Sequence, residues 1–193
     1  MRRGFKTQAE RTAAEFRGRL GCRADESISI EALAADLGVE LVPAGDLVPT
    51  QRFEELNELQ DDAFSAVTFR LPSGRRVVVS NPLHTPGRTR SNQSHELAHI
   101  ILQHSLRTVE QLGGFTFLTC DVEQEEEADW LAGCLLLPRD LLYQEARRGR
   151  TPIEIAKLHV TSETMARFRL NASGVLIQIG RANAIKAKRR PSK

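Results

Sequence analysis

The 193-residue sequence has little of what marks several common protein classes. Its three cysteines, Cys22, Cys120 and Cys134, are odd in number and widely spaced, which argues against a disulfide framework and a four-cysteine zinc site. No apolar run approaches the length of a membrane span, and the basic N-terminal stretch lacks the continuous apolar segment of a secretory signal. We therefore expect a cytoplasmic protein with reduced thiols and no membrane partner.

An excess of charge of one sign is also missing. The net charge of +2 is too small to argue for a direct nucleic-acid partner, while 40% hydrophobic residues suffice for a core and exclude wholesale disorder. The length suits one domain of ordinary size. We predict a single domain over residues 1–180, helical over about 1–45, and a basic, disordered tail over residues 181–193. Nothing in the sequence indicates the oligomeric state.

Helical periodicity dominates the N-terminal part. It predicts one helix that ends at Gly21 and a second that is capped by Ser29 and ends at Gly38, followed by the short strand VELVP. The stretch FEELNELQDDA fits either a short helix or a loop. Two β-rich runs around the turn PSG then predict a hairpin over residues 64–81.

The C-terminal part is expected to be mainly helical. After the loop PLHTPGRTR, a helix is predicted with Ser91 or Asn92 as its N-cap, and RTVEQLGGFTFLTCD is interpreted as a loop. A second helix with a run of acids is predicted from Asp121 to Pro138, where proline ends it. PRDLLYQEARRG predicts another helix, TPIEIAKLHVTSETMARFRLNASG two short ones, and GVLIQIG a last strand.

The stretch SHELAHIILQH predicts a metal-binding helix. His95 and His99 are four residues apart, so on a helix they lie one turn apart on the same face and can bind one zinc ion. Glu96 follows the first histidine, where it can accept a proton from a zinc-bound water. His-Glu-x-x-His therefore supplies two ligands and one general base, and the apolar residues around the motif favour a buried helix.

The third ligand must come from elsewhere in the chain. His104 lies five residues after His99, so we expect it at the helix end or on the surface, rotated away from the ligand face. Among the three consecutive glutamates that begin the second helix, we favour Glu125 and keep Glu126 as the alternative. Glu125 shares a helical face with two alanines and with Asp129, one turn on, which can accept the free N–H of a ligand histidine.

The remaining acids at the start of this helix have no such assignment. Glu123, Glu126 and Glu127 are expected to be solvated. The reaction also needs a donor to the developing oxyanion. Tyr143 and His159 could supply one, but no spacing singles out either residue, and packing roles are favoured for both.

Together, HELAH and EEEADWLAGCLLLP resemble the ImmA/IrrE family of metallopeptidases, whose second signature is Glu-x-x-Ala-Asn-x-Phe-Ala-x-x-Leu-Leu-Met-Pro. The resemblance extends over about residues 1–170 and aligns the family's third zinc ligand with Glu125. Asp129, Leu131 and Leu137 depart from the signature without removing a catalytic group. The family implies an α+β, zincin-like fold of the gluzincin type, with N-terminal helices, a small sheet and an active-site helix.

The resemblance also implies a function: a zinc endopeptidase with one ion that makes a limited cut in a repressor-type protein and often acts beside a helix-turn-helix partner. One hairpin strand could hold an extended substrate by backbone pairing, or the hairpin could only cover the core. A rival interpretation is a DNA-binding protein, because residues 153–170 have helix-turn-helix spacing. Another is a regulator that binds its partner without cleaving it, against which the intact Glu96 argues.

Overall fold

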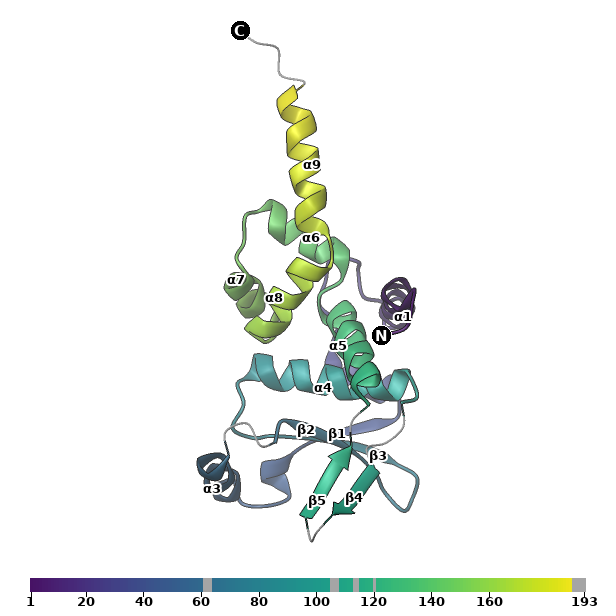
Figure 1. Cartoon of the computed structure of the whole chain (residues 1–193), viewed down its shortest axis with the longest axis vertical. Helices are drawn as coiled ribbons and strands as arrows, with labels where there is room; N and C mark the ends of the chain where they lie inside the picture. The colour runs from purple at the N-terminus through teal and green to yellow at the C-terminus, as the bar shows by residue number, and fades with distance from the viewer. Residues whose placement is uncertain (61–63, 105–107, 113–114, 120, 189–193) are drawn as a thin grey trace.

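The computed structural model describes residues 1–60, 64–104, 108–112, 115–119 and 121–188. They form an α+β fold, in agreement with the predicted class (Figure 1). In chain order the elements are α1 (Phe5–Arg19), α2 (Ile30–Asp36), β1 (Val39–Pro43), the 3-10 turn η1 (Ala44–Asp46), α3 (Gln51–Leu59), β2 (Ala66–Arg70), β3 (Arg76–Ser80), α4 (Pro86–Ile101), β4 (Thr108–Leu112), β5 (Phe115–Thr119), α5 (Val122–Leu136), α6 (Arg139–Arg147), α7 (Pro152–His159), α8 (Glu163–Ala172) and α9 (Val175–Lys188).

A three-stranded sheet forms one end of the molecule, with strand order β1-β3-β2. β1 pairs with β3 in parallel, and β2 pairs with β3 as the antiparallel hairpin that the sequence predicts. Gly74 adopts the positive φ of 84° that the hairpin turn requires. β3 is central and buries its valines, whereas β2 lies at an edge of this sheet. α4 packs on the sheet, and α5 packs against α4 (Figure 1).

α4 begins earlier than predicted. Ser91 and Asn92 lie inside the helix, which starts at Pro86 with Thr85 as its N-cap. The Thr85 hydroxyl accepts a hydrogen bond from the backbone N–H of Arg88 at 3.4 Å, and proline suits the first helical position because it needs no N–H there. The prediction of a loop throughout PLHTPGRTR is therefore wrong, because the stretch is helical from Pro86 onward. The earlier start makes α4 a 16-residue helix, and the His-Glu-x-x-His motif lies in its last two turns.

The core is built around α5. Its second half is buried on all sides, and in this half Ala132 contacts α4, where Ser94 donates a hydrogen bond to the Ala132 carbonyl at 3.3 Å. Ala98, Ala128 and Ala132 are fully buried, so the two helices can approach closely. A single apolar cluster runs from Phe5 in α1 to Val175 at the start of α9.

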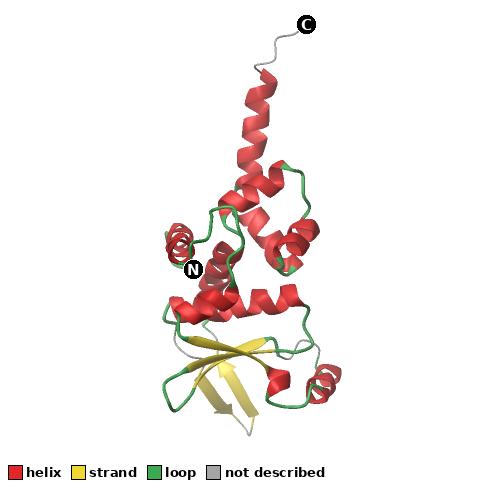
Figure 2. Cartoon of the chain, turned by 180° about the vertical axis from the view of Figure 1, so that it is seen from behind, coloured by secondary structure: helices red, strands yellow, loops and turns green. Residues whose placement is uncertain are grey.

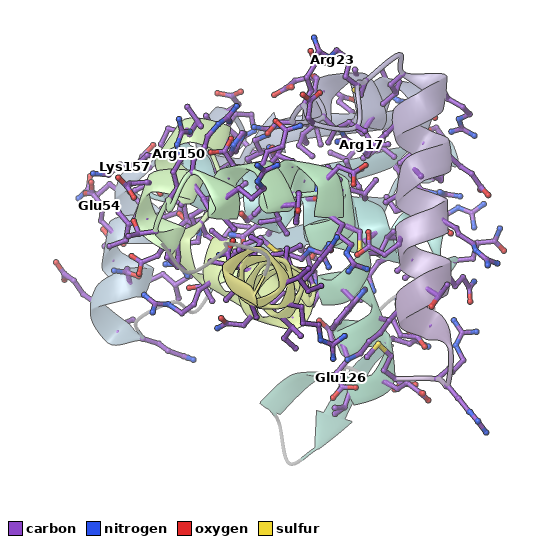
Figure 3. All side chains as sticks on the ribbon, turned by 90° about the horizontal axis from the view of Figure 1, so that it is seen from above. Arg17, Arg23, Glu54, Glu126, Arg150 and Lys157 are labelled. Carbon is purple, nitrogen blue, oxygen red and sulfur yellow. The ribbon has the colours of Figure 1, made fainter. Side chains whose placement is uncertain are left out.

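Two buried arginines satisfy the C-terminal end of α5, which has no basic residue in its own last turn. Arg17 from α1 donates to the Leu135 carbonyl at 3.0 Å, and Arg169 from α8 donates to the Leu137 carbonyl at 3.3 Å. Cations suit the partial negative charge of a helix C-terminus. In the view from above, Arg17 lies on the inner side of α1, whereas Arg23 lies at the periphery (Figure 3).

Gly133 makes the approach of α8 possible, because a Cβ at this position would collide with the Arg169 side chain. α7 and α8 are the two short helices that the sequence predicts, joined through Val160 in the left-handed conformation. α8 turns Met165, Ala166 and Arg169 into the core. The helix pair therefore closes the domain against α5.

The C-terminal prediction of a last strand is wrong. GVLIQIG enters α9, which continues to Lys188 and projects from the end of the molecule opposite the sheet (Figure 2). Residues 181–188, which the sequence assigns to a disordered tail, are therefore helical, and residues 189–193 lie outside the described part. A short apolar run cannot by itself distinguish a strand from a buried helical turn, and the Ala-rich sequence that follows favours helix.

Another difference lies between α4 and α5, where a loop was expected. β4 and β5 form a separate antiparallel two-stranded sheet. Residues 105–107 and Cys120 lie outside the described residues, so the interpretation of that cysteine has no structural counterpart here. Within the described residues, no helix combines the length and the apolar character that a membrane crossing would need.

Candidate metal centre

Three predicted ligands meet between α4 and α5. One donor atom each from His95, His99 and Glu125 lies within 4.8 Å of the other two. His95 Nε2 is 3.0 Å from His99 Nε2 and 3.1 Å from Glu125 Oε2, and His99 Nε2 is 3.6 Å from Glu125 Oε1. All three side chains are partly buried.

This spacing fits a tetrahedral zinc site. Nitrogen and oxygen ligands about 2.0–2.1 Å from a tetrahedral ion lie about 3.3 Å from each other. The three separations, of which the two to Glu125 involve different oxygens of its carboxylate, scatter around that value. Two imidazoles and a carboxylate are also the donor set of many catalytic zinc sites, which keep a fourth position for water. The residues present therefore fit a catalytic metal ion.

Asp129 supports the first histidine from α5. His95 Nδ1 donates to Asp129 Oδ1 at 2.8 Å, so the ring presents Nε2 to His99 and Glu125. Burial alone would lower the pKa of His95, but the hydrogen bonds with Asp129 and Glu125 outweigh it and raise this pKa to about 9. The hydrogen bond with His95 and the nearby ring of His99 hold the pKa of Glu125 well below its ordinary value. Without metal, the site therefore holds a proton on His95 opposite an ionised carboxylate.

Glu96 points toward the sheet rather than toward α5. Its side chain is buried, and Thr68 in the edge strand β2 donates a hydrogen bond to Glu96 Oε2 at 2.6 Å. This contact orients one carboxylate oxygen of Glu96 and joins the helix to the sheet edge. Sequence reasoning missed Thr68, because its partner lies 28 residues away and no local spacing relates the two positions.

The three consecutive glutamates have three different environments. Glu125 faces the histidines, and the Glu126 side chain is more than half exposed, as predicted for a solvated acid. Figure 3 shows Glu126 at the periphery. The prediction for Glu127 is wrong: its side chain is only 3% exposed, and the Arg2 guanidinium holds it through bonds of 2.8 and 2.7 Å.

The prediction for His104 is correct for its place at the helix end and wrong for the direction of its ring. The residue follows the end of α4 but folds back, so that its Nδ1 lies 2.9 Å from His99 Nδ1 and its side chain is 6% exposed. The cause is Gln103, whose φ of 54° breaks the helical periodicity on which the prediction depended. Helical spacing therefore gave the wrong direction for this ring.

The two candidate oxyanion donors contact other parts of the chain. His159 Nδ1 lies 3.2 Å from the Ser27 hydroxyl, and its Nε2 lies 3.6 Å from the Glu145 carboxylate. Tyr143 packs against the main core and lies beside the Arg147 guanidinium. These contacts agree with packing roles.

The two arginines of α8 are both paired with carboxylates and are therefore poorly suited to bind DNA phosphates. The buried Arg169 pairs with Glu10, and the exposed Arg167 pairs with Glu163. The positive charge of the helix is therefore compensated within the chain, and a duplex backbone would need uncompensated cations.

Comparison with known proteins gives one match. Residues 51–171 fit the family model of the M78 peptidases, described as the IrrE N-terminal-like domain. The matched segment spans more than half of the chain and contains both helices of the candidate metal centre. No match was found among curated proteins or among solved structures.

Proposed function

The chain belongs to the M78 family of IrrE N-terminal-like peptidases, and on that premise we propose that it is a zinc-dependent endopeptidase. Family membership implies metallopeptidase chemistry. The convergence of His95, His99 and Glu125 beside Glu96 is the observation that carries the finer proposal. Zinc is favoured over other divalent ions because two imidazoles and one carboxylate suit it.

In this proposal Glu96 transfers the proton, and Thr68 and Asp129 hold the reacting groups in place. A bound zinc ion would polarise the scissile carbonyl and lower the pKa of a water molecule. Glu96 accepts the proton of the attacking water and returns it to the nitrogen of the leaving amine. Thr68 holds the Glu96 carboxylate in place through the 2.6 Å hydrogen bond, and Asp129 holds the ring of His95.

The edge strand β2 supports a substrate-binding role. The backbone N–H of Asn81 bonds to the Ser65 carbonyl, so in this antiparallel register residues 65, 67 and 69 bond to β3. The backbone groups of Ala66, Thr68 and Arg70 therefore point to the free edge of the three-stranded sheet. An extended substrate that pairs with this edge would run past Thr68, whose side chain contacts Glu96.

We further propose that the substrate is a repressor-type protein with a helix-turn-helix domain, cut once in an extended segment. The resemblance of the two joined motifs to the ImmA/IrrE peptidases supports this substrate class. An edge strand that binds backbone groups supports it as well, because such pairing selects extended linkers over folded elements.

The test uses the zinc-loaded full chain and its Glu96→Gln variant. Each is incubated with purified repressor-type proteins from the same genome, and products are identified by intact mass spectrometry. We expect one cut by the parent chain and a loss of at least about 100-fold with Glu96→Gln, at unchanged zinc content. Cleavage that survives Glu96→Gln, or no cleavage of any repressor by the zinc-loaded parent, would contradict the proposal.

A matched pair of variants tests the edge strand. Arg70→Pro removes an N–H that points to the free edge, whereas Arg70→Ala keeps it, and proline is tolerated on edge strands. We expect kcat/KM to fall about tenfold further in the proline variant than in the alanine variant, with equal zinc affinity. Equal kcat/KM for the two variants would show that the free edge of β2 does not bind the substrate.

A further inference from the structure

His104 lies against the ring of His99 in a geometry that the proposed reaction does not explain. After α4 ends, Gln103 in the left-handed conformation turns the chain, and the His104 backbone N–H bonds to the His99 carbonyl at 3.0 Å. The two rings meet edge to face with their centroids 5.0 Å apart. Their Nδ1 atoms are 2.9 Å apart, which is a hydrogen-bond distance.

The positions of the nitrogens decide which ring donates. His99 Nε2 faces His95 Nε2 and Glu125, so it must be without a proton to bind a metal. The proton of a neutral His99 is then on Nδ1, which can only donate. The facing Nδ1 of His104 must therefore accept, and the proton of His104 is placed on its Nε2.

That second proton points toward a buried carboxylate. His104 Nε2 is buried and lies 3.7 Å from Glu127 Oε2, outside ordinary hydrogen-bond range but close enough for an electrostatic contact. Glu127 is in turn held by the guanidinium and the backbone N–H of Arg2. The carboxylate therefore favours the His104 tautomer that leaves Nδ1 free to accept.

We propose that His104 is a positioning residue that fixes the tautomer and orientation of His99, with Glu127 and Arg2 behind it. The inference rests on the metal site of the proposed function. It assigns His99 an outer support of its own: a second imidazole instead of the carboxylate that supports His95. Nothing in the helical spacing of the motif specifies this partner.

Two substitutions at His104 separate positioning from packing. His104→Asn places an amide oxygen near the position of Nδ1 and can accept from His99, whereas His104→Leu fills similar space without an acceptor. We expect the leucine variant to bind Zn²⁺ about 10–100-fold more weakly than the parent chain, and the asparagine variant to stay within about threefold. Affinity is measured by competition with a chromogenic zinc chelator.

Two additional measurements exclude a purely structural effect. Thermal unfolding of the metal-free variants reports how packing is affected, and the absorption spectrum of bound Co²⁺ reports ligand geometry. We expect the Co²⁺ spectrum to change with His104→Leu and to be preserved with His104→Asn, whatever the two unfolding temperatures are. If His104→Leu fails to fold, a parent-like Co²⁺ spectrum and zinc affinity in His104→Asn still support the inference, and their loss overturns it.

Glu127 and Glu126 offer a matched control at the next step. Glu127→Gln removes the charge that favours the His104 tautomer, whereas Glu126→Gln removes an equal charge from the exposed neighbouring position. We expect about threefold to tenfold weaker zinc binding for Glu127→Gln and no change for Glu126→Gln. Equal effects of the two variants would overturn the part of the inference that concerns Glu127.

The results separate this inference from the proposed function. Parent-like zinc affinity in His104→Leu overturns the inference and leaves the peptidase proposal intact. A zinc-loaded parent chain that does not cleave overturns the peptidase proposal but not the role of His104. A parent chain that binds no zinc overturns both.

Discussion

The two histidines of the candidate centre differ in the groups that hydrogen-bond to their Nδ1 atoms. His95 bonds directly to the carboxylate of Asp129, whose side chain is 61% exposed. His99 bonds to His104, which faces Glu127, a carboxylate that is 3% exposed. Solvent screens the first support more strongly than the second. The same type of ligand thus depends on an accessible charge on one side and on a buried group on the other.

The largest expected effect is the loss of the ligand that faces both histidines. Glu125→Gln keeps the shape of the side chain but removes the charge that balances the metal, so zinc affinity should fall at least about 1,000-fold. Chelator competition measures the loss, and Glu126→Gln is the control at the adjacent exposed position. If the two variants bind zinc equally well, Glu125 is not a ligand, and His95 and His99 do not share a metal site with it.

A double variant tests whether the two supports are independent. Asp129→Ala should weaken zinc binding about tenfold, less than His104→Leu, because its hydrogen bond to His95 is partly exposed. If the supports act separately, the combined variant should show the product of the two effects, about 100–1,000-fold. A combined loss no larger than the bigger single effect would show that both residues act through one shared arrangement.

The pH dependence of zinc binding tests whether Asp129 raises the pKa of His95. Zinc must displace the proton from His95, so affinity should rise about tenfold per pH unit from pH 7 and level off near pH 9. The raised pKa also stabilises the metal-free fold below about pH 6.5, and this contribution is lost as pH rises through about 9. In Asp129→Ala the levelling should occur at a lower pH. A plateau at the same pH would mean that Asp129 does not raise the pKa of His95.

The smallest expected effect concerns Glu96, which is part of neither the support of His95 nor that of His99. Thr68→Val keeps the shape of the residue and removes the hydroxyl that bonds to Glu96. We expect kcat to fall about tenfold while zinc affinity stays at the parent value. Thr68→Ser, a substitution at the same position that keeps the hydroxyl, is the control. A fall in zinc affinity with Thr68→Val would show that the sheet edge also holds the metal ligands.

Helical spacing was sufficient to select the three residues that the structure brings together. His95, His99 and Glu96 follow from one helical motif, and the structure places Glu125, the residue favoured by its helical face, beside the two histidines. Their metal-binding roles stay predictions. The surroundings could not be predicted in the same way, because His104 depends on one left-handed residue and Thr68 on the pairing of a distant strand.

Two of the elements that differ from the predictions carry local signals in the sequence. Thr85–Pro86 is a common beginning of a helix, and the alternation of β-branched and aromatic residues around Gly113 and Gly114 is typical of a hairpin. The helix α9 is a different case, since GVLIQIG has no periodicity that excludes a strand. Only the sequence after it, with its strong helix formers, indicates the correct structure.

Two arginines near the N-terminus that bond to α5 limit how much of this chain can be removed. Arg17, which bonds to the Leu135 carbonyl, and Arg2, which holds Glu127, both precede residue 51, where the family match begins. Truncation to the matched segment would strip α1 from α5, uncover apolar surface and leave carbonyl groups without donors. The segment that identifies the family is thus shorter than the segment that must fold.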